Sequence, residues 1–148
     1  MKLAIGCDHG GFILKEEVLK HLKEKGIEFE DFGTYSLESC DYPDIAEKVA
    51  NAIVLKTCDL GILICGTGIG ISIAANKIPG IRAALCSDTF SAHACREHNN
   101  ANILALGERV MGKGLALDIV DTFLNAKFEG GRHERRVNKI TELENKNK

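Results

Sequence analysis

The sequence predicts an α/β fold in which one parallel sheet of five strands is covered by helices on both faces. Short apolar segments alternate with amphipathic segments along all 148 residues, as in successive strand–helix–strand units. Residues 60–65, LGILIC, are apolar throughout, which is typical of a strand buried on both faces. No internal repeat or linker interrupts the pattern, so we expect a single domain over residues 1–148.

Each element in the first half of the chain is indicated by its own periodicity. Residues 3–7 form a short apolar strand, and the apolar positions of residues 12–22 recur at helical spacing before Gly26 stops the helix. Residues 27–32 alternate between polar and apolar side chains, which is the period of a strand. Residues 42–53 then carry a helical apolar face, and the buried strand follows.

The second half continues the alternation. A glycine loop leads into a short helix that ends at Asn76, and Ser87 or Asp88 is a favoured cap for a helix that runs to Glu97. The polar tail, residues 144–148, is expected to be frayed. The remaining elements are strands at 82–86 and 103–106 and helices at 114–124 and 132–143.

Composition and charge argue against several classes of protein. The net charge is −2 and the basic residues are scattered, so no nucleic-acid-binding surface is expected. Without a long apolar run or a signal peptide, the protein is expected to be cytoplasmic and to have no membrane partner. The six cysteines include no C-x-x-C pair and should be reduced thiols. His93 and His98 fall on different faces of a helix, so no metal is expected there.

The expected topology brings two polar turns together. Right-handed crossovers place strand 3–7 between strands 27–32 and 60–65. The turns that follow strands 3–7 and 60–65 then meet at the carboxyl edge of the sheet. This is a topological switch point, where such sheets bind ligands.

The turn after the first strand carries Asp8 and His9, followed by two glycines. An acid and an imidazole at a strand end can face a ligand cleft. Equally, Asp8 is a favoured helix cap and His9 can be an exposed side chain without a role. The residues alone leave both interpretations open.

The loop Cys65–Gly70, CGTGIG, predicts an anion-binding site. Its three glycines let the backbone approach a ligand and point several N–H groups inward. Cys65, at the edge of that positive field, is a plausible base, although a small core residue would also be a cysteine. The G-x-G-x-G spacing does not match a dinucleotide fingerprint, and the loop lacks the ending of a triphosphate-binding P-loop.

Two further groups of residues can contact an anionic ligand. His98 can exchange protons near neutral pH, and we expect it at the same carboxyl edge as Cys65, although His98 and Asn99 also suit a helix C-cap. Arg132 and Arg136 are four residues apart, so they share one helix face. Paired guanidinium groups suit a phosphate, and a solvated basic face is the ordinary alternative.

The sequence resembles the type B ribose-5-phosphate isomerase family, whose members include galactose-6-phosphate and allose-6-phosphate isomerases. The resemblance spans nearly the whole chain and is carried by GCDHGG, DYPD, CGTGIGISIAANK, CSDTFSAHACREHNNANILALGERV and the C-terminal Arg132 and Arg136. It implies a Rossmann-like three-layer α/β/α sandwich and an isomerase of the pentose phosphate pathway that uses no cofactor or metal. It also implies a homodimer whose sites are shared between subunits, and it leaves a tetramer open.

The resemblance further implies a role for each site residue. Cys65 would transfer the proton, His98, helped by Asp8, would open the sugar ring, and Asn99 would bind the sugar. The enediolate would be held by Thr67 and the N–H groups of Gly66, Gly68, Ile69 and Gly70. The phosphate would be bound by His9, Arg109, Arg132 and Arg136.

Ribose 5-phosphate, interconverted with ribulose 5-phosphate, is the substrate that the resemblance favours. A six-carbon sugar phosphate, allose 6-phosphate or galactose 6-phosphate, is the first alternative. A non-catalytic small-molecule-binding domain and a nucleotide-binding module are alternatives from other classes. Turnover of a sugar phosphate would separate the enzyme from both of these.

Overall fold

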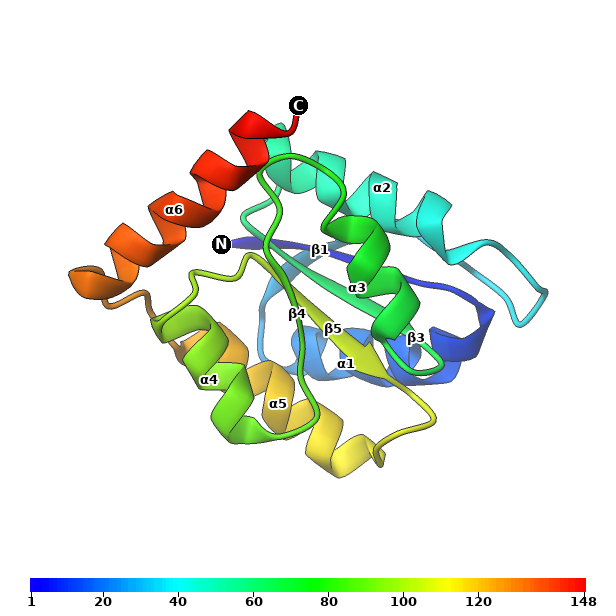
Figure 1. Cartoon of the computed structure of the whole chain (residues 1–148). Helices are drawn as coiled ribbons and strands as arrows, with labels where there is room; N and C mark the ends of the chain where they lie inside the picture. Colours follow the sequence, from blue (N-terminus) through cyan, green and yellow to red (C-terminus); the bar gives the residue numbers. More distant parts are fainter.

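The computed structural model describes all 148 residues and contains one parallel five-stranded sheet in the order β2–β1–β3–β5–β4. The predicted α/β class and the five-stranded parallel sheet are confirmed (Figure 1). The strands are β1 (Lys2–Cys7), β2 (Glu28–Asp31), β3 (Leu60–Cys65), β4 (Ala83–Leu85) and β5 (Ile103–Gly107).

Six α-helices and one short 3₁₀ helix connect and follow the strands. They are η1 (His9–Gly11), α1 (Phe12–Glu24), α2 (Tyr42–Val54), α3 (Ile69–Ala75), α4 (Thr89–Glu97), α5 (Lys113–Asn125) and α6 (Arg132–Lys146). Of the two predicted caps of α4, Asp88 is the one used, because its carboxylate accepts the N–H of Ser91. None of the helices combines the length and apolar character needed to cross a bilayer.

Residues 144–146 of the tail, which we expected to be frayed, are helical in the structure. Helix α6 continues to Lys146, three residues beyond the predicted end of the helix. The Glu144 carboxylate accepts the N–H of Gly80 at 3.0 Å, and this contact holds the last turns of α6 against the loop before β4.

Alternate residues of the strands point to opposite faces of the sheet and pack in two separate cores. The sheet and the helices on its two faces therefore form three layers. Ile62 and Ile64 of β3 pack in the core with α1, α4 and α5. Leu63 and Cys65 pack in the core with α2 and α3, on the opposite face. The Rossmann-like three-layer sandwich is therefore confirmed, with α6 lying outside the two helical layers (Figure 1).

The predicted switch point is also present. β1 lies between β2 and β3, with Leu3 opposite both Phe29 and Leu60. Cys7 at the end of β1 is paired with Ile64 of β3, so the two strands end side by side. The turns that follow β1 and β3 therefore meet at the carboxyl edge of the sheet.

Candidate active site

The first polar turn is folded tightly against the glycine loop. Asp8 is buried, and its Oδ1 accepts the N–H of Gly10 at 2.9 Å. Asp8 therefore caps η1, which was one of the two interpretations of this residue from the sequence. A Cβ atom on Gly10 would lie 3.0 Å from the amide nitrogen of Gly66. The two turns can approach this closely because residue 10 is glycine.

The glycine loop makes a hydrogen bond to the sulfur of Cys65. The N–H of Gly68 donates to Cys65 Sγ at 3.0 Å, and the N–H of Ile69 donates to Thr67 Oγ1 at 3.2 Å. Gly68 has φ +79°, a conformation that side chains disfavour, and a Cβ there would meet the backbone of Leu106. Two of the N–H groups predicted to face a ligand, those of Gly68 and Ile69, are thus hydrogen-bonded within the loop. The N–H of Gly68 is the one that donates to the sulfur.

Arg109 joins the same edge from the turn after β5. Its N–H donates to the carbonyl of Gly66 at 3.0 Å. Its guanidinium lies over that glycine, since a Cβ on Gly66 would be 3.1 Å from Arg109 Nη1. A cationic side chain therefore lies beside the glycine loop.

Two contacts from the segment before and within α2 complete this edge. The N–H of Cys40 donates to His9 Nδ1 at 3.2 Å. The ring of Tyr42 packs against Gly70, where a Cβ would lie 2.7 Å from the ring. Tyr42 lies in the DYPD motif but was assigned no role from the sequence, because its contact with Gly70 is made across the fold.

The structure places His98 at the opposite edge of the sheet, so its predicted place beside Cys65 is wrong. His98 is the C-cap of α4, and its N–H donates to the carbonyl of Ala94 at 2.8 Å. Helix α4 begins at the carboxyl end of β4 and returns to the amino end of β5. Asn99 is exposed beside it at that amino edge. The five residues of β5 separate the two edges by about 17 Å.

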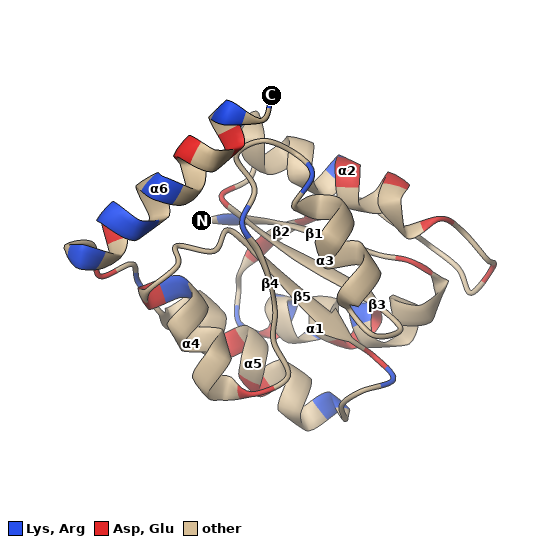
Figure 2. Cartoon of the chain, in the orientation of Figure 1, with Lys and Arg blue, Asp and Glu red and all other residues tan.

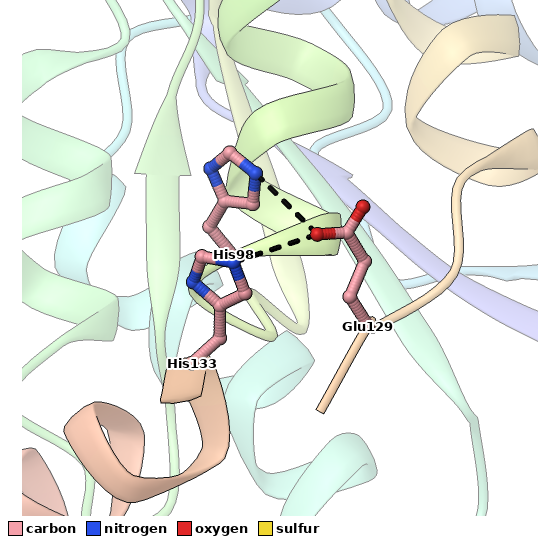
Figure 3. A group of neighbouring side chains, drawn as sticks. All are labelled: His98, Glu129 and His133. Carbon is pink, nitrogen blue, oxygen red and sulfur yellow. Dashed lines mark ion pairs between the residues drawn. The ribbon is translucent and has the colours of Figure 1, made fainter. Parts of the chain in front are cut away.

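At the amino edge, His98 belongs to a cluster with Glu129 and His133 (Figure 3). Glu129 Oε1 lies 3.7 Å from His98 Nε2 and 3.4 Å from His133 Nε2. The two rings are stacked with centroids 4.3 Å apart. Partial burial, followed by the positive charges of His98 and Arg132, lowers the pKa of His133. The only indication of this cluster in the sequence is the position of His133 next to Arg132.

The cluster is the one group of side chains that could hold a metal ion, with ligand atoms within 4.8 Å of one another. The planes of the two imidazole rings differ by only 12°. A metal lies in the plane of each imidazole that binds it. The lone pairs of two nearly parallel, stacked rings therefore point in parallel directions and do not converge on one ion. One ring would have to rotate before both could bind a single ion.

Arg132 and Arg136 begin α6 beside this cluster. Both side chains are exposed, and their spacing places them on one face of the helix. Figure 2 shows basic residues gathered at this end of α6. The N–H of Glu129 donates to the carbonyl of Glu97 at 3.0 Å, which joins the segment before α6 to the end of α4.

The chain thus divides the predicted site residues into two groups. The carboxyl-edge group brings together the base candidate, the glycine loop and part of the phosphate group: Asp8, His9, Cys65, Gly66, Thr67, Gly68, Ile69, Gly70 and Arg109. The amino-edge group consists of His98, Asn99, Arg132 and Arg136.

Comparison with known proteins identifies the family. A family model described as Ribose/Galactose Isomerase matches residues 3–140. The chain belongs to the ribose/galactose isomerase family. The predicted enzyme class, an isomerase, and the resemblance found in the sequence are both confirmed.

Members of the ribose/galactose isomerase family match this chain over nearly its whole length. Ribose-5-phosphate isomerase B of Escherichia coli is 57% identical over 143 residues, covering 97% of this chain and 96% of the relative. D-erythrulose-4-phosphate isomerase of Pectobacterium atrosepticum is 44% identical, covering 100% and 98%. The structure of ribose-5-phosphate isomerase B from Clostridium thermocellum superposes with a TM-score of 0.99 at 61% identity, covering 100% of each chain.

Proposed function

We propose that this protein interconverts ribose 5-phosphate and ribulose 5-phosphate by ring opening and proton transfer through an enediolate. The contact that carries the proposal is the hydrogen bond from the Gly68 N–H to Cys65 Sγ at 3.0 Å, inside a glycine loop next to Arg109. It orients a nucleophilic sulfur and supplies a donor to its charge once the proton has left. The similarity to ribose-5-phosphate isomerase B of E. coli supports ribose 5-phosphate as the substrate.

In the proposed reaction Cys65, as thiolate, takes the proton from C2 of the open-chain aldose and returns it to C1. A proton moves from O2 to O1, so that the carbonyl passes from C1 to C2 and no atom is gained or lost. The negative charge of the enediolate is held by Thr67 and the remaining N–H groups of the loop. Stabilising an oxyanion with fixed donors is often the largest single contribution to such catalysis.

The separation of the two groups of residues supports a site built by two subunits. Ring opening is assigned to His98, which lies at the opposite edge of the sheet from Cys65 of the same chain. Beside the glycine loop, Ile69 and Ile73 expose 51% and 57% of their surface on one face of α3. We propose that a second copy covers this apolar surface and supplies His98, Asn99, Arg132 and Arg136 to the loop. All six cysteines are free thiols, which supports a reducing, cytoplasmic location.

The proposed function is tested by turnover of four sugar phosphates measured side by side. We expect kcat/KM to be highest for ribose 5-phosphate, above erythrulose 4-phosphate, allose 6-phosphate and galactose 6-phosphate. A higher kcat/KM for a six-carbon sugar phosphate would identify that sugar phosphate as the preferred substrate of the same reaction. Binding of sugar phosphates without turnover of any of them would contradict an enzymatic role and favour a binding domain.

A further inference from the structure

The hydrogen bond between Cys40 and His9 determines which nitrogen of the imidazole carries a hydrogen. A backbone N–H can only donate, so Nδ1 of His9, 3.2 Å from the Cys40 nitrogen, must be the acceptor. In a neutral imidazole the ring hydrogen then lies on Nε2. Nε2 of His9 makes no hydrogen bond within the chain, so its N–H remains available to a ligand.

We propose that the backbone amide of Cys40 is a positioning group that holds His9 in the Nε2–H tautomer, ready to donate to a phosphate oxygen. The identity of the ligand rests on the proposed function, whereas the tautomer is a property of the free protein. A phosphate oxygen only accepts hydrogen bonds. In the opposite tautomer, the lone pair on Nε2 would point at the phosphate oxygen and repel it. Holding His9 in the Nε2–H tautomer avoids this repulsion before the substrate binds.

The segment that carries Cys40 is attached to the sheet at its beginning. The N–H of Cys7 donates to the carbonyl of Gly33 at 2.7 Å, and the N–H of Thr34 donates to the carbonyl of Cys7 at 2.7 Å. These bonds continue the pairing with β1 beyond the end of β2. Residues 37–39 beyond them are exposed, and the segment ends where α2 begins at Tyr42.

Lys15 of α1 also holds the beginning of this segment against the sheet. Its side chain is fully buried, and Nζ donates to Asp31 Oδ1 at 2.7 Å and to the carbonyl of Thr34 at 2.5 Å. The same Nζ lies 5.1 Å from the ring centroid of Tyr35. A buried ammonium group is retained only when it is paired and hydrogen-bonded, so these contacts restrict where the segment can lie. The hydrogen bond to His9 uses the backbone amide of Cys40 and does not involve its side chain.

The tautomer can be read directly by long-range ¹H–¹⁵N NMR on protein labelled at its histidines, with the His9 signals identified by their loss in His9→Gln. We expect Nδ1 of His9 to show the shift of an unprotonated nitrogen and Nε2 that of a protonated one, at a pH where the ring is neutral. Inorganic phosphate should move the Nε2 signal and leave Nδ1 unprotonated. A protonated Nδ1, an even mixture of tautomers, or no response of Nε2 to phosphate would overturn the proposal.

A matched pair of variants separates the amide from the side chain. Cys40→Pro removes the N–H itself, whereas Cys40→Ala removes the thiol and keeps the N–H. We expect Cys40→Pro to mix the two tautomers and to raise the KM for ribose 5-phosphate by about 2- to 10-fold, the effect of one ordinary hydrogen bond. Cys40→Ala should match the parent in both measurements.

The signals of His21 and His93, which lie away from the carboxyl edge, report whether Cys40→Pro is folded. If they move, the wild-type tautomer measurement alone decides the proposal. A folded Cys40→Pro that keeps the parental tautomer would contradict it. Because the NMR readout uses free protein and inorganic phosphate, failure of the proposed isomerase activity would leave the tautomer result standing and be recognised separately.

Discussion

Two cysteines end neighbouring strands, and their surroundings differ. Cys7 ends β1 and packs in the core with α1, α4 and α5, where burial raises its pKa to about 12. Cys65 ends β3 and packs in the opposite core, where the N–H of Gly68 donates to its sulfur. A thiol with a pKa near 12 stays protonated at neutral pH and cannot act as a base. Cys7 is therefore unsuited to proton transfer, and Cys65 is the cysteine that contacts the glycine loop.

Cys65→Ala should abolish exchange of the C2 proton while leaving binding of the sugar phosphate nearly intact, because the proposed phosphate contacts lie elsewhere. We expect exchange to fall by at least about 10²-fold, the usual contribution of a positioned base. NMR of substrate incubated in D₂O measures this exchange. Cys7→Ala is the matched control and should exchange at the parental rate. Parental exchange in Cys65→Ala would show that the base is another group.

His98→Asn should separate ring opening from proton transfer at carbon. Asparagine keeps hydrogen bonding but does not titrate, so turnover of the cyclic aldose should fall by about 10²-fold or more. Ribulose 5-phosphate cannot form a furanose, so formation of the enediolate from that ketose should survive. Stopped-flow or NMR rates from both substrates provide the comparison, with His93→Asn on the same helix as the control. Equal losses with both substrates would contradict a role confined to ring opening.

Helix α6 contributes little to the core of its own chain. Val137 is its only buried residue, and Ile140 and Leu143 expose 48% and 60% of their surface. Its contacts lie at its two ends, beside α4 and against the loop before β4. His133 in its first turn stacks on His98, whereas the side chains of Arg132 and Arg136 are exposed and open to a ligand or to another subunit.

Arg132→Ala and Arg136→Ala should each raise KM for ribose 5-phosphate, because the two guanidinium groups share one face of α6. Loss of one charge-assisted hydrogen bond corresponds to about a 10- to 100-fold rise in KM. Arg135→Ala is the control, since its side chain lies about 100° around the helix from Arg136 and about 60° from Arg132, on the side away from Arg136. Steady-state kinetics on the three variants decide the point. Equal effects at all three positions would indicate general positive charge and not a shared phosphate site.

At the scale of the whole molecule, Cys65 and His98 lie at opposite edges of the sheet, so one chain does not bring the two proposed catalytic groups together. A sheet of closely packed strands lies between the two groups, and both cores fill the space around it. Packed interiors do not allow one edge to bend round to the other. The proposed site would therefore be completed by a second copy of the chain, with the amino edge of one copy meeting the carboxyl edge of its partner.

Mixing two inactive variants should restore activity if the site is shared. In a dimer of Cys65→Ala with His98→Asn, one site has both mutations and the other has neither. Random exchange of subunits would make half of the dimers mixed, so we expect about a quarter of the parental activity with ribose 5-phosphate. The two variants are assayed separately and after unfolding and refolding together. Activity that stays at the sum of the separate variants would show that each site is contained in one chain.

The sequence predicted all five strands and six α-helices, with boundaries that differ by a few residues at most positions. β3 was predicted at its observed bounds because a fully apolar run is a local signal. The order of β1 between its two neighbours followed from crossover handedness, a general constraint on parallel sheets. The extension of α6 to Lys146 was missed because it depends on a contact between Glu144 and Gly80, which are 64 residues apart.

Local patterns were enough to find the strands, the capping residue Asp88, the glycine loop and the family, since periodicity and motifs depend on neighbours along the chain. The placement of His98 opposite Cys65, the stacking of His98 on His133 and the hydrogen bond from Cys40 to His9 emerged only from the folded chain. Each of these joins segments that are distant in sequence, and their geometry follows from the direction in which each helix crosses the sheet. Candidate site residues could thus be proposed from the sequence, whereas their division between two edges emerged only from the folded chain.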